Sequence, residues 1–138
     1  MIGICRGAQF LCVMNGGILI QHQRNPKFLH TLETANGIQN LFMSSLHHQA
    51  QYPFGLPKNR YKILAWTNGV SPVHYGQTWE EVLDTPKECE IVYYPKNRCL
   101  GIQGHPELLG EMTDHYPIIH RSIEYCQDLL NNFLKNKL

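Results

Sequence analysis

No uninterrupted apolar run in this 138-residue chain is long enough to cross a membrane. Charge of either sign is scarce, with 12 Lys and Arg against 11 Asp and Glu and a net charge of +1. Basic residues do not cluster, so neither nucleic acid nor an anionic membrane is expected as a partner. The first twenty residues have no basic N-terminal region and include Arg6, which argues against a signal peptide.

The chain also has no cysteine pattern typical of disulfides or zinc. Its five cysteines are an odd number without a C-x-x-C, which favours a reducing compartment, and we predict a cytoplasmic protein. We expect Cys12, Cys89, Cys99 and Cys126 to be small core residues. The histidines lack partners at zinc-like spacing. The sequence therefore predicts no metal site and no cofactor.

Length and composition favour one domain over residues 1–138. With 43% hydrophobic residues, the chain can form a real core, but it is too short for two. An Asn36-Gly37 turn favours a hairpin, strand-like runs fill the middle of the chain, and helical spacing flanks them. We therefore predict an α/β fold with an antiparallel excursion. The expected strands are 2–5, 17–20, 28–33, 41–45, 61–67, 91–94 and 99–103. The expected helices are 7–15 and one after Pro117. We expect a surface loop at residues 51–60 and a helical turn at residues 79–83.

Residues 3–9, GICRGAQ, are typical of a cysteine on a sharp strand-to-helix turn. Gly3 and Gly7 bracket Cys5, and such a turn needs small flanking residues. A thiol at a helix N-terminus faces the positive end of the dipole, so we expect a lowered pKa for Cys5. The backbone N–H of Arg6 would point at the oxygen of a carbonyl under attack. A buried structural cysteine beside a tight turn is the alternative interpretation of this string.

Residues 104–107, GHPE, supply an imidazole and a carboxylate two positions apart. On extended backbone that spacing puts His105 and Glu107 on the same face. A thiol, an imidazole and a carboxylate are the parts of a nucleophile, base and orienting system. The sequence therefore predicts nucleophilic attack by Cys5, with His105 as the base.

Three strings in order give the chain a resemblance to the class I glutamine amidotransferase family. GICRGAQ resembles the cysteine elbow, and GIQGHPE, residues 101–107, resembles the strand-end string with the catalytic His and Glu. SSLHHQ, residues 44–49, resembles the substrate loop in the version of stand-alone γ-glutamyl hydrolases, and short phage proteins are similar. The resemblance implies a partial flavodoxin-like three-layer sandwich, with a mostly parallel sheet plus antiparallel strands.

The resemblance also implies roles for individual residues. Cys5 would attack the γ-carboxamide of glutamine or of a γ-glutamyl amide and form a γ-glutamyl thioester. His105 would act as base and then acid, Glu107 would orient it, and the Arg6 N–H would hold the oxyanion. Gln9 and the backbone of Ser45 and Leu46 would hold the substrate's α-amino and α-carboxylate groups, and His47 would be a further substrate-binding residue.

The pattern departs from the family in two respects. The elbow begins at Met1, whereas in the family several βα units precede it and one of their loops completes the oxyanion hole. Residues 1–138 would thus be the C-terminal, catalytic portion of such a domain. Ser44 and Gly104 stand where related enzymes often carry Asn and a bulky residue. Because of this difference, the resemblance does not define the substrate closely.

Two functional interpretations follow. The first is an amide hydrolase, working alone or beside a synthase subunit, whose missing N-terminal half is either a separate chain or a segment upstream of a misassigned start. The second is a catalytically inactive binding or assembly module that keeps the triad residues. In either case an exposed sheet edge favours self-association or pairing with another chain.

Overall fold

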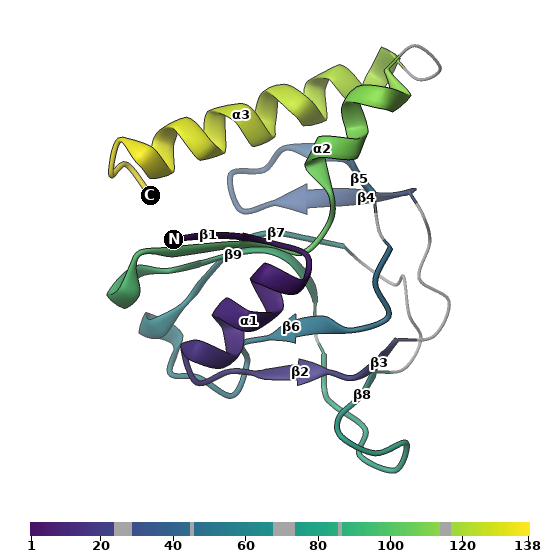
Figure 1. Ribbon diagram of the computed structural model, residues 1–138, viewed down its shortest axis with the longest axis vertical. Helices are drawn as coiled ribbons and strands as arrows, with labels where there is room; N and C mark the ends of the chain where they lie inside the picture. Colours follow the sequence, from purple (N-terminus) through teal and green to yellow (C-terminus); the bar gives the residue numbers. More distant parts are fainter. Residues whose placement is uncertain (24–28, 45, 68–73, 86, 114–116) are drawn as a thin grey trace.

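The structure is a computed structural model that describes residues 1–23, 29–44, 46–67, 74–85, 87–113 and 117–138. Within these residues a six-stranded sheet is accompanied by two short strand pairs (Figure 1). The order across the main sheet is β1 (Ile2–Ile4), β10 (Cys99–Ile102), β9 (Glu88–Tyr94), β7 (Lys62–Thr67), β4 (Leu29–Thr34) and β5 (Gln39–Ser44). The short pairs are β2 (Ile18–Ile20) with β6 (Ala50–Tyr52), and β3 (His22–Gln23) with β8 (His74–Tyr75).

Helices cover both faces of the main sheet, as Figure 1 shows. On one face α1 (Arg6–Met14) packs against β1 and β10, and the β2–β6 pair lies beside it. On the other face lie α2 (Pro106–Leu109) and α3 (His120–Leu134). Short 3₁₀ turns occupy Lys58–Arg60, Pro95–Asn97, Gly110–Met112 and Pro117–Ile119. The predicted α/β class and its three layers are confirmed.

The hydrophobic core divides into two clusters, one on each face of the sheet. Strand β9 is buried along its whole length and contributes to both. The cluster beneath α3 includes Leu32, Leu41, Met43, Ile91, Tyr93, Leu100, Ile102, Cys126, Leu129 and Phe133. The cluster beneath α1 contains Leu11, Cys12, Cys89, Val92, Tyr94 and Cys99.

The directions of the strands correct one detail of the predicted fold, the mostly parallel sheet. Among the described strands of the main sheet, β1 and β10 are parallel, and the remaining neighbours are antiparallel. Parallel neighbours need a long crossover between them, whereas tight turns give antiparallel pairs. The turn at residues 36–37 joins β4 to β5, and the Pro95–Asn97 turn joins β9 to β10. These turns account for two of the four antiparallel pairs among the described strands of the main sheet.

Several elements differ from the expected ones. The segment expected to be a loop from residue 51 begins within β6, and α2 begins inside GHPE, at Pro106, where no helix was expected. The helical turn expected at residues 79–83 is a single turn one residue earlier, in which Glu81 N–H donates to the Thr78 carbonyl at 3.3 Å. It lies in a small hairpin, where Gly76 N–H and Leu83 N–H donate to the Glu81 and His74 carbonyls. The turn expected at residues 68–69 lies outside the described residues.

The other sequence expectations about the core are confirmed. Cys12, Cys89, Cys99 and Cys126 are buried and, like Cys5, are free thiols. Helix α3 buries Ser122, Cys126, Leu129 and Phe133, which recur at helical spacing. No helix in the described part of the chain is long and apolar enough to span a membrane.

Candidate functional site

The turn between β1 and α1 holds Cys5 in a strained backbone conformation. Cys5 is the N-cap of α1, with φ 50° and ψ −107°, a region that side chains with a Cβ rarely adopt. Its N–H donates to the Ile102 carbonyl at 2.8 Å, and its own carbonyl accepts from Gln9 N–H at 3.1 Å. The turn is thus fixed to β10 on one side and to α1 on the other.

The two glycines beside Cys5 have different reasons to be there. A Cβ on Gly3 would lie 2.5 Å from both the carbonyl carbon and the oxygen of Gly7, and 2.9 Å from Ala8 N. A Cβ on Gly7 would meet no heavy atom within 4 Å. Close packing of α1 against β1 therefore requires Gly3. Space alone does not require glycine at position 7, contrary to the sequence-based expectation.

The topology brings Cys5 and His105 to the same edge of the sheet. Cys5 follows β1, and His105 comes three residues after β10 ends at Ile102. These strands are parallel neighbours, with Ile4 paired to Ile102. The carboxyl ends of parallel strands are where α/β folds commonly bind ligands. The thiol and the imidazole predicted to act together thus come from adjacent strand ends.

His105 and Glu107 form a hydrogen-bonded pair. His105 Nδ1 lies 2.7 Å from Glu107 Oε1, and their side chains are 22% and 52% exposed. The contact arises differently from the expectation of an extended backbone, because His105 caps α2 and Glu107 lies in its first turn. The His105 backbone is held from β5, since its N–H donates to Ser44 O at 3.2 Å and Ser44 Oγ donates to its carbonyl at 2.7 Å.

The electrostatics of the thiol differ from the sequence-based expectation. Burial raises the pKa of Cys5 above its ordinary value, and the carboxylates of Glu107 and Glu90 raise it further. A hydrogen bond from the Arg6 N–H and the charge of its guanidinium lower the pKa of Cys5, but burial has the larger effect. The expectation of a lowered pKa is therefore wrong. At neutral pH the thiol keeps its proton, so its reaction needs a base.

The Arg6 N–H stands where an oxyanion donor would be needed. The first N–H groups of a helix have no intrahelical partner, and this one faces the sulfur of Cys5. The exposed Arg6 side chain turns to the loop after β5, where its Nη1 donates to Gln49 Oε1 at 2.6 Å. The oxyanion role of Arg6 stays a prediction.

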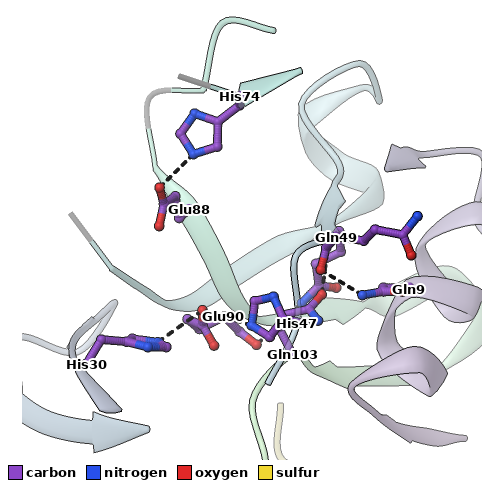
Figure 2. A network of polar contacts seen from close by, with 9 residues as sticks. Gln9, His30, His47, Gln49, His74, Glu88, Glu90 and Gln103 are labelled. Carbon is purple, nitrogen blue, oxygen red and sulfur yellow. Dashed lines mark hydrogen bonds and ion pairs between the residues drawn. The ribbon is translucent and has the colours of Figure 1, made fainter. Parts of the chain in front are cut away.

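The residues expected to bind substrate lie on α1 and on the loop after β5. Gln9 is buried, and its Nε2 donates to the Gln49 carbonyl at 2.7 Å (Figure 2). His47 is buried as well, whereas the Leu46 side chain is 59% exposed. Ser45 lies outside the described residues. Gln9 and the loop with His47 are thus brought together, and their binding roles stay predictions.

The structure places further polar side chains at this site to which the sequence assigned no binding or catalytic role. Ser44 and Gln49 belong to the SSLHHQ string, which was the available signal for them. His30, Glu90 and Gln103 are also buried here, from β4, from β9 and from the residue after β10. Their sequence neighbours gave no signal, because long-range strand pairing brings them together. In the described residues, no group of three or more His, Cys, Asp or Glu side chains is arranged to hold a metal ion.

Comparison with solved structures identifies a related fold. A glutamine amidotransferase from Thermotoga maritima matches with a TM-score of 0.55 and 15% identity, over 99% of this chain and 61% of that chain. A protein described as a putative GMP synthase subunit, from Thermoplasma acidophilum, matches with a TM-score of 0.55 and 18% identity, over 94% of this chain and 58% of that chain. No protein-family model and no curated protein matches. The chain therefore has the fold of these structures and spans about three fifths of their length.

Proposed function

We propose that this chain is the catalytic portion of a cysteine-dependent amidase, which hydrolyses the γ-carboxamide of glutamine or of a γ-glutamyl amide. The observation that carries the proposal is the meeting of two strand ends. Cys5 stands on a strained turn directly after β1, and the hydrogen-bonded His105–Glu107 pair follows the parallel neighbour β10. The fold shared with glutamine amidotransferase structures supports the substrate class.

The proposed reaction begins with a neutral thiol. Glu107 accepts the Nδ1–H of His105, so the other ring nitrogen is free to take the proton of Cys5. The sulfur attacks the γ-carbonyl carbon, and the Arg6 N–H donates to the oxygen that becomes negative. The C–N bond then breaks as His105 returns the proton to the nitrogen, which leaves as ammonia or an amine.

A second half-reaction regenerates the thiol. His105 takes a proton from water, and the oxygen attacks the γ-glutamyl thioester carbon. The C–S bond breaks, the thiol regains its proton, and a free γ-carboxylate leaves. General acid–base help of this kind contributes roughly 10²–10⁴-fold in rate.

A further polypeptide partner is part of the proposal. Met1 O and Cys5 N bond to β10, so the backbone groups of Ile2 and Ile4 point to the open side of β1, because bonding alternates along a strand. Exposed apolar residues surround this edge: Met1, Ile2, Ile4, Phe10, Val13 and Met14. An open edge with apolar flanks favours an added strand. Three partners would fit this edge: a chain that supplies the rest of the domain, a synthase subunit, or a second copy of this chain.

The exposed edge also supports the second candidate, an inactive assembly module. The two candidates differ in whether Cys5 turns over an amide. We expect purified protein to release ammonia from glutamine or p-nitroaniline from γ-glutamyl-p-nitroanilide, and Cys5→Ser to abolish release. Cys12→Ser is the matched control, since Cys12 is buried away from the site and its Sγ already donates to the Ile18 carbonyl. Equal release from wild type and Cys5→Ser would rule out the proposed nucleophile.

A further inference from the structure

Gln49 joins the turn that carries Cys5 to the loop after β5. Its Oε1 accepts a hydrogen bond from Arg6 Nη1 at 2.6 Å. Its backbone carbonyl accepts a second one from Gln9 Nε2 at 2.7 Å, as Figure 2 shows. Arg6 and Gln9 are three positions apart on α1, so they lie on one side of the helix. A single residue of the loop therefore holds the start of α1 at two points.

Gln49 is also held from its other side. Its Nε2 donates to Gln21 Oε1 at 2.5 Å, and Gln21 lies between β2 and β3. The preceding loop residue is tied to the same region, because Gln23 N–H donates to the His48 carbonyl at 2.8 Å. The side chains of Arg6, Gln49 and Gln21 thus form a continuous chain from α1 to the segment between β2 and β3.

The chemistry of the three groups fixes the direction of this chain. A guanidinium group only donates hydrogen bonds, so the amide oxygen of Gln49 faces Arg6 and its NH₂ group faces Gln21. Arg6 is exposed, and an exposed arginine samples many rotamers unless a partner holds it. The bond to Gln49 therefore restricts where the guanidinium lies.

The place of this guanidinium matters to the candidate nucleophile. Arg6 follows Cys5 directly, and its positive charge lowers the pKa of the thiol. Burial and the carboxylates of Glu107 and Glu90 raise that pKa, and Glu107 is in turn paired with His105. The backbone N–H of Arg6 is also the proposed oxyanion donor. A partner of the Arg6 side chain can thus affect both the charge near the sulfur and the turn that carries it.

We propose that Gln49 is a positioning residue of the candidate site, which holds the Arg6 guanidinium near Cys5 and fixes the first turn of α1 to the loop after β5. The inference rests on the proposed amidase function and adds a residue to it. Gln49 touches no reacting atom under this proposal and acts through Arg6. Because the bond from Gln9 goes to the backbone carbonyl of Gln49, a substitution of the Gln49 side chain leaves that bond in place.

The first test measures the reactivity of the thiol and needs no substrate. In Gln49→Met the side chain keeps its length and loses both hydrogen bonds, so the Arg6 guanidinium is released into water. We expect iodoacetamide to alkylate Cys5 about threefold more slowly at pH 7.5, the effect of one screened charge near the thiol. The rate on Cys5→Ser is subtracted from each measurement. Since the effect comes from a charge, a salt concentration of about 1 M should reduce it.

A double-mutant cycle shows whether Gln49 acts through Arg6. Arg6→Met keeps the backbone N–H and removes the guanidinium, so it should slow alkylation at least as much as Gln49→Met. When Gln49→Met is made in the Arg6→Met variant, it should cause almost no further slowing. Gln39→Met is the matched control, because Gln39 is an exposed glutamine at the other end of β5, and its alkylation rate should equal that of the wild type.

The proposed amidase activity gives a second measurement. Gln49→Met should lower kcat on γ-glutamyl-p-nitroanilide about 10-fold, the factor expected for a lost hydrogen bond to a charged group. KM should stay close to the wild-type value, because the Gln9 bond remains. Gln49→Glu still accepts from Arg6 and should recover part of kcat. Its carboxylate opposes the guanidinium charge, so alkylation should stay slow. A rise in KM without a fall in kcat would contradict the positioning role.

Three results of the alkylation test would overturn the inference. They are a wild-type rate in Gln49→Met, an equal slowing in Gln39→Met, and a full additional loss in the double variant. If Gln49→Met does not fold, as judged by circular dichroism, Gln21→Met replaces it, since it removes the acceptor on the far side of the Gln49 amide. It should slow alkylation in the same direction, and an unchanged rate would overturn the inference. Failure of the amidase proposal has a different signature: the wild type hydrolyses no amide, and the alkylation rates still decide the role of Gln49.

Discussion

The sharpest structural prediction concerns Gly3. In Gly3→Ala the new Cβ would meet backbone atoms of Gly7 at 2.5 Å and of Ala8 at 2.9 Å, and backbone atoms cannot rotate away as a side chain can. Helix α1 must therefore move off β1. Overpacking of this kind costs about 1–3 kcal/mol. For a chain of 138 residues, each kcal/mol corresponds to a fall in Tm of about 3–5 °C.

The same displacement should affect chemistry. Cys5 and the Arg6 N–H sit at the N-terminus of the helix that must move. A misplacement of about 1 Å costs on the order of 10²-fold in rate. We therefore expect Gly3→Ala to lose stability in urea titrations followed by circular dichroism, and to lose about 100-fold in amide hydrolysis.

Gly7→Ala provides the opposite outcome within the same turn. Its Cβ would enter open space within α1, and Ala in a helix is about 0.5–1 kcal/mol more favourable than Gly. We expect this variant to be more stable than wild type and to keep its activity. Gly3→Ala with wild-type stability, or Gly7→Ala with an equal loss, would refute the packing argument.

Three further predictions concern the site. Because burial raises the pKa of Cys5, iodoacetamide should alkylate it more slowly than free cysteine at pH 7.5, and the rate should increase with pH. The rate measured on Cys5→Ser gives the alkylation of the other cysteines and is subtracted. Alkylation of Cys5 faster than that of free cysteine would contradict the raised pKa. Ser44→Ala should lower the free energy of unfolding in urea titrations by about 1 kcal/mol. It should also lower kcat without changing KM, since Ser44 Oγ donates to the His105 carbonyl. An unchanged kcat would contradict the role of Ser44 in positioning His105. Gly104→Ala should lower the free energy of unfolding by about 1–3 kcal/mol, because its Cβ would lie 2.1 Å from Met43 Cγ and 2.6 Å from the Ser44 carbonyl oxygen. The same substitution should cost less when it is made in the Met43→Ala variant. An equal cost in both backgrounds would contradict the side-chain clash.

Features that depend on residues close together in the sequence could be predicted. The glycine-flanked cysteine indicated the turn between β1 and α1, and the Asn36-Gly37 pair indicated the β4–β5 hairpin. The apolar spacing after Pro117 indicated α3. In each case the signal comes from residues within a few positions of one another, so no knowledge of distant partners is needed.

The environment of Glu90 shows why the rest was not predictable. Glu90 lies in β9, opposite register shifts in the pairing with β7 between Ile63 and Trp66. Such irregularities change which side chains face the core, and they depend on a strand about 25 residues away. The groups that face its carboxylate, His30 and His47, come from still more distant segments. A local pattern cannot report contacts of this range.

The same reasoning explains why the sequence predicted the wrong direction for the pKa of Cys5. A helix N-terminus beside Cys5 can be read from sequence, but burial and the fields of Glu107 and Glu90 cannot, and these raise its pKa. Under the proposed function Glu107 has a further task, because it orients His105. The sulfur would therefore become nucleophilic only through a base, the role proposed for His105, and the thiol alone would have a low reactivity at neutral pH.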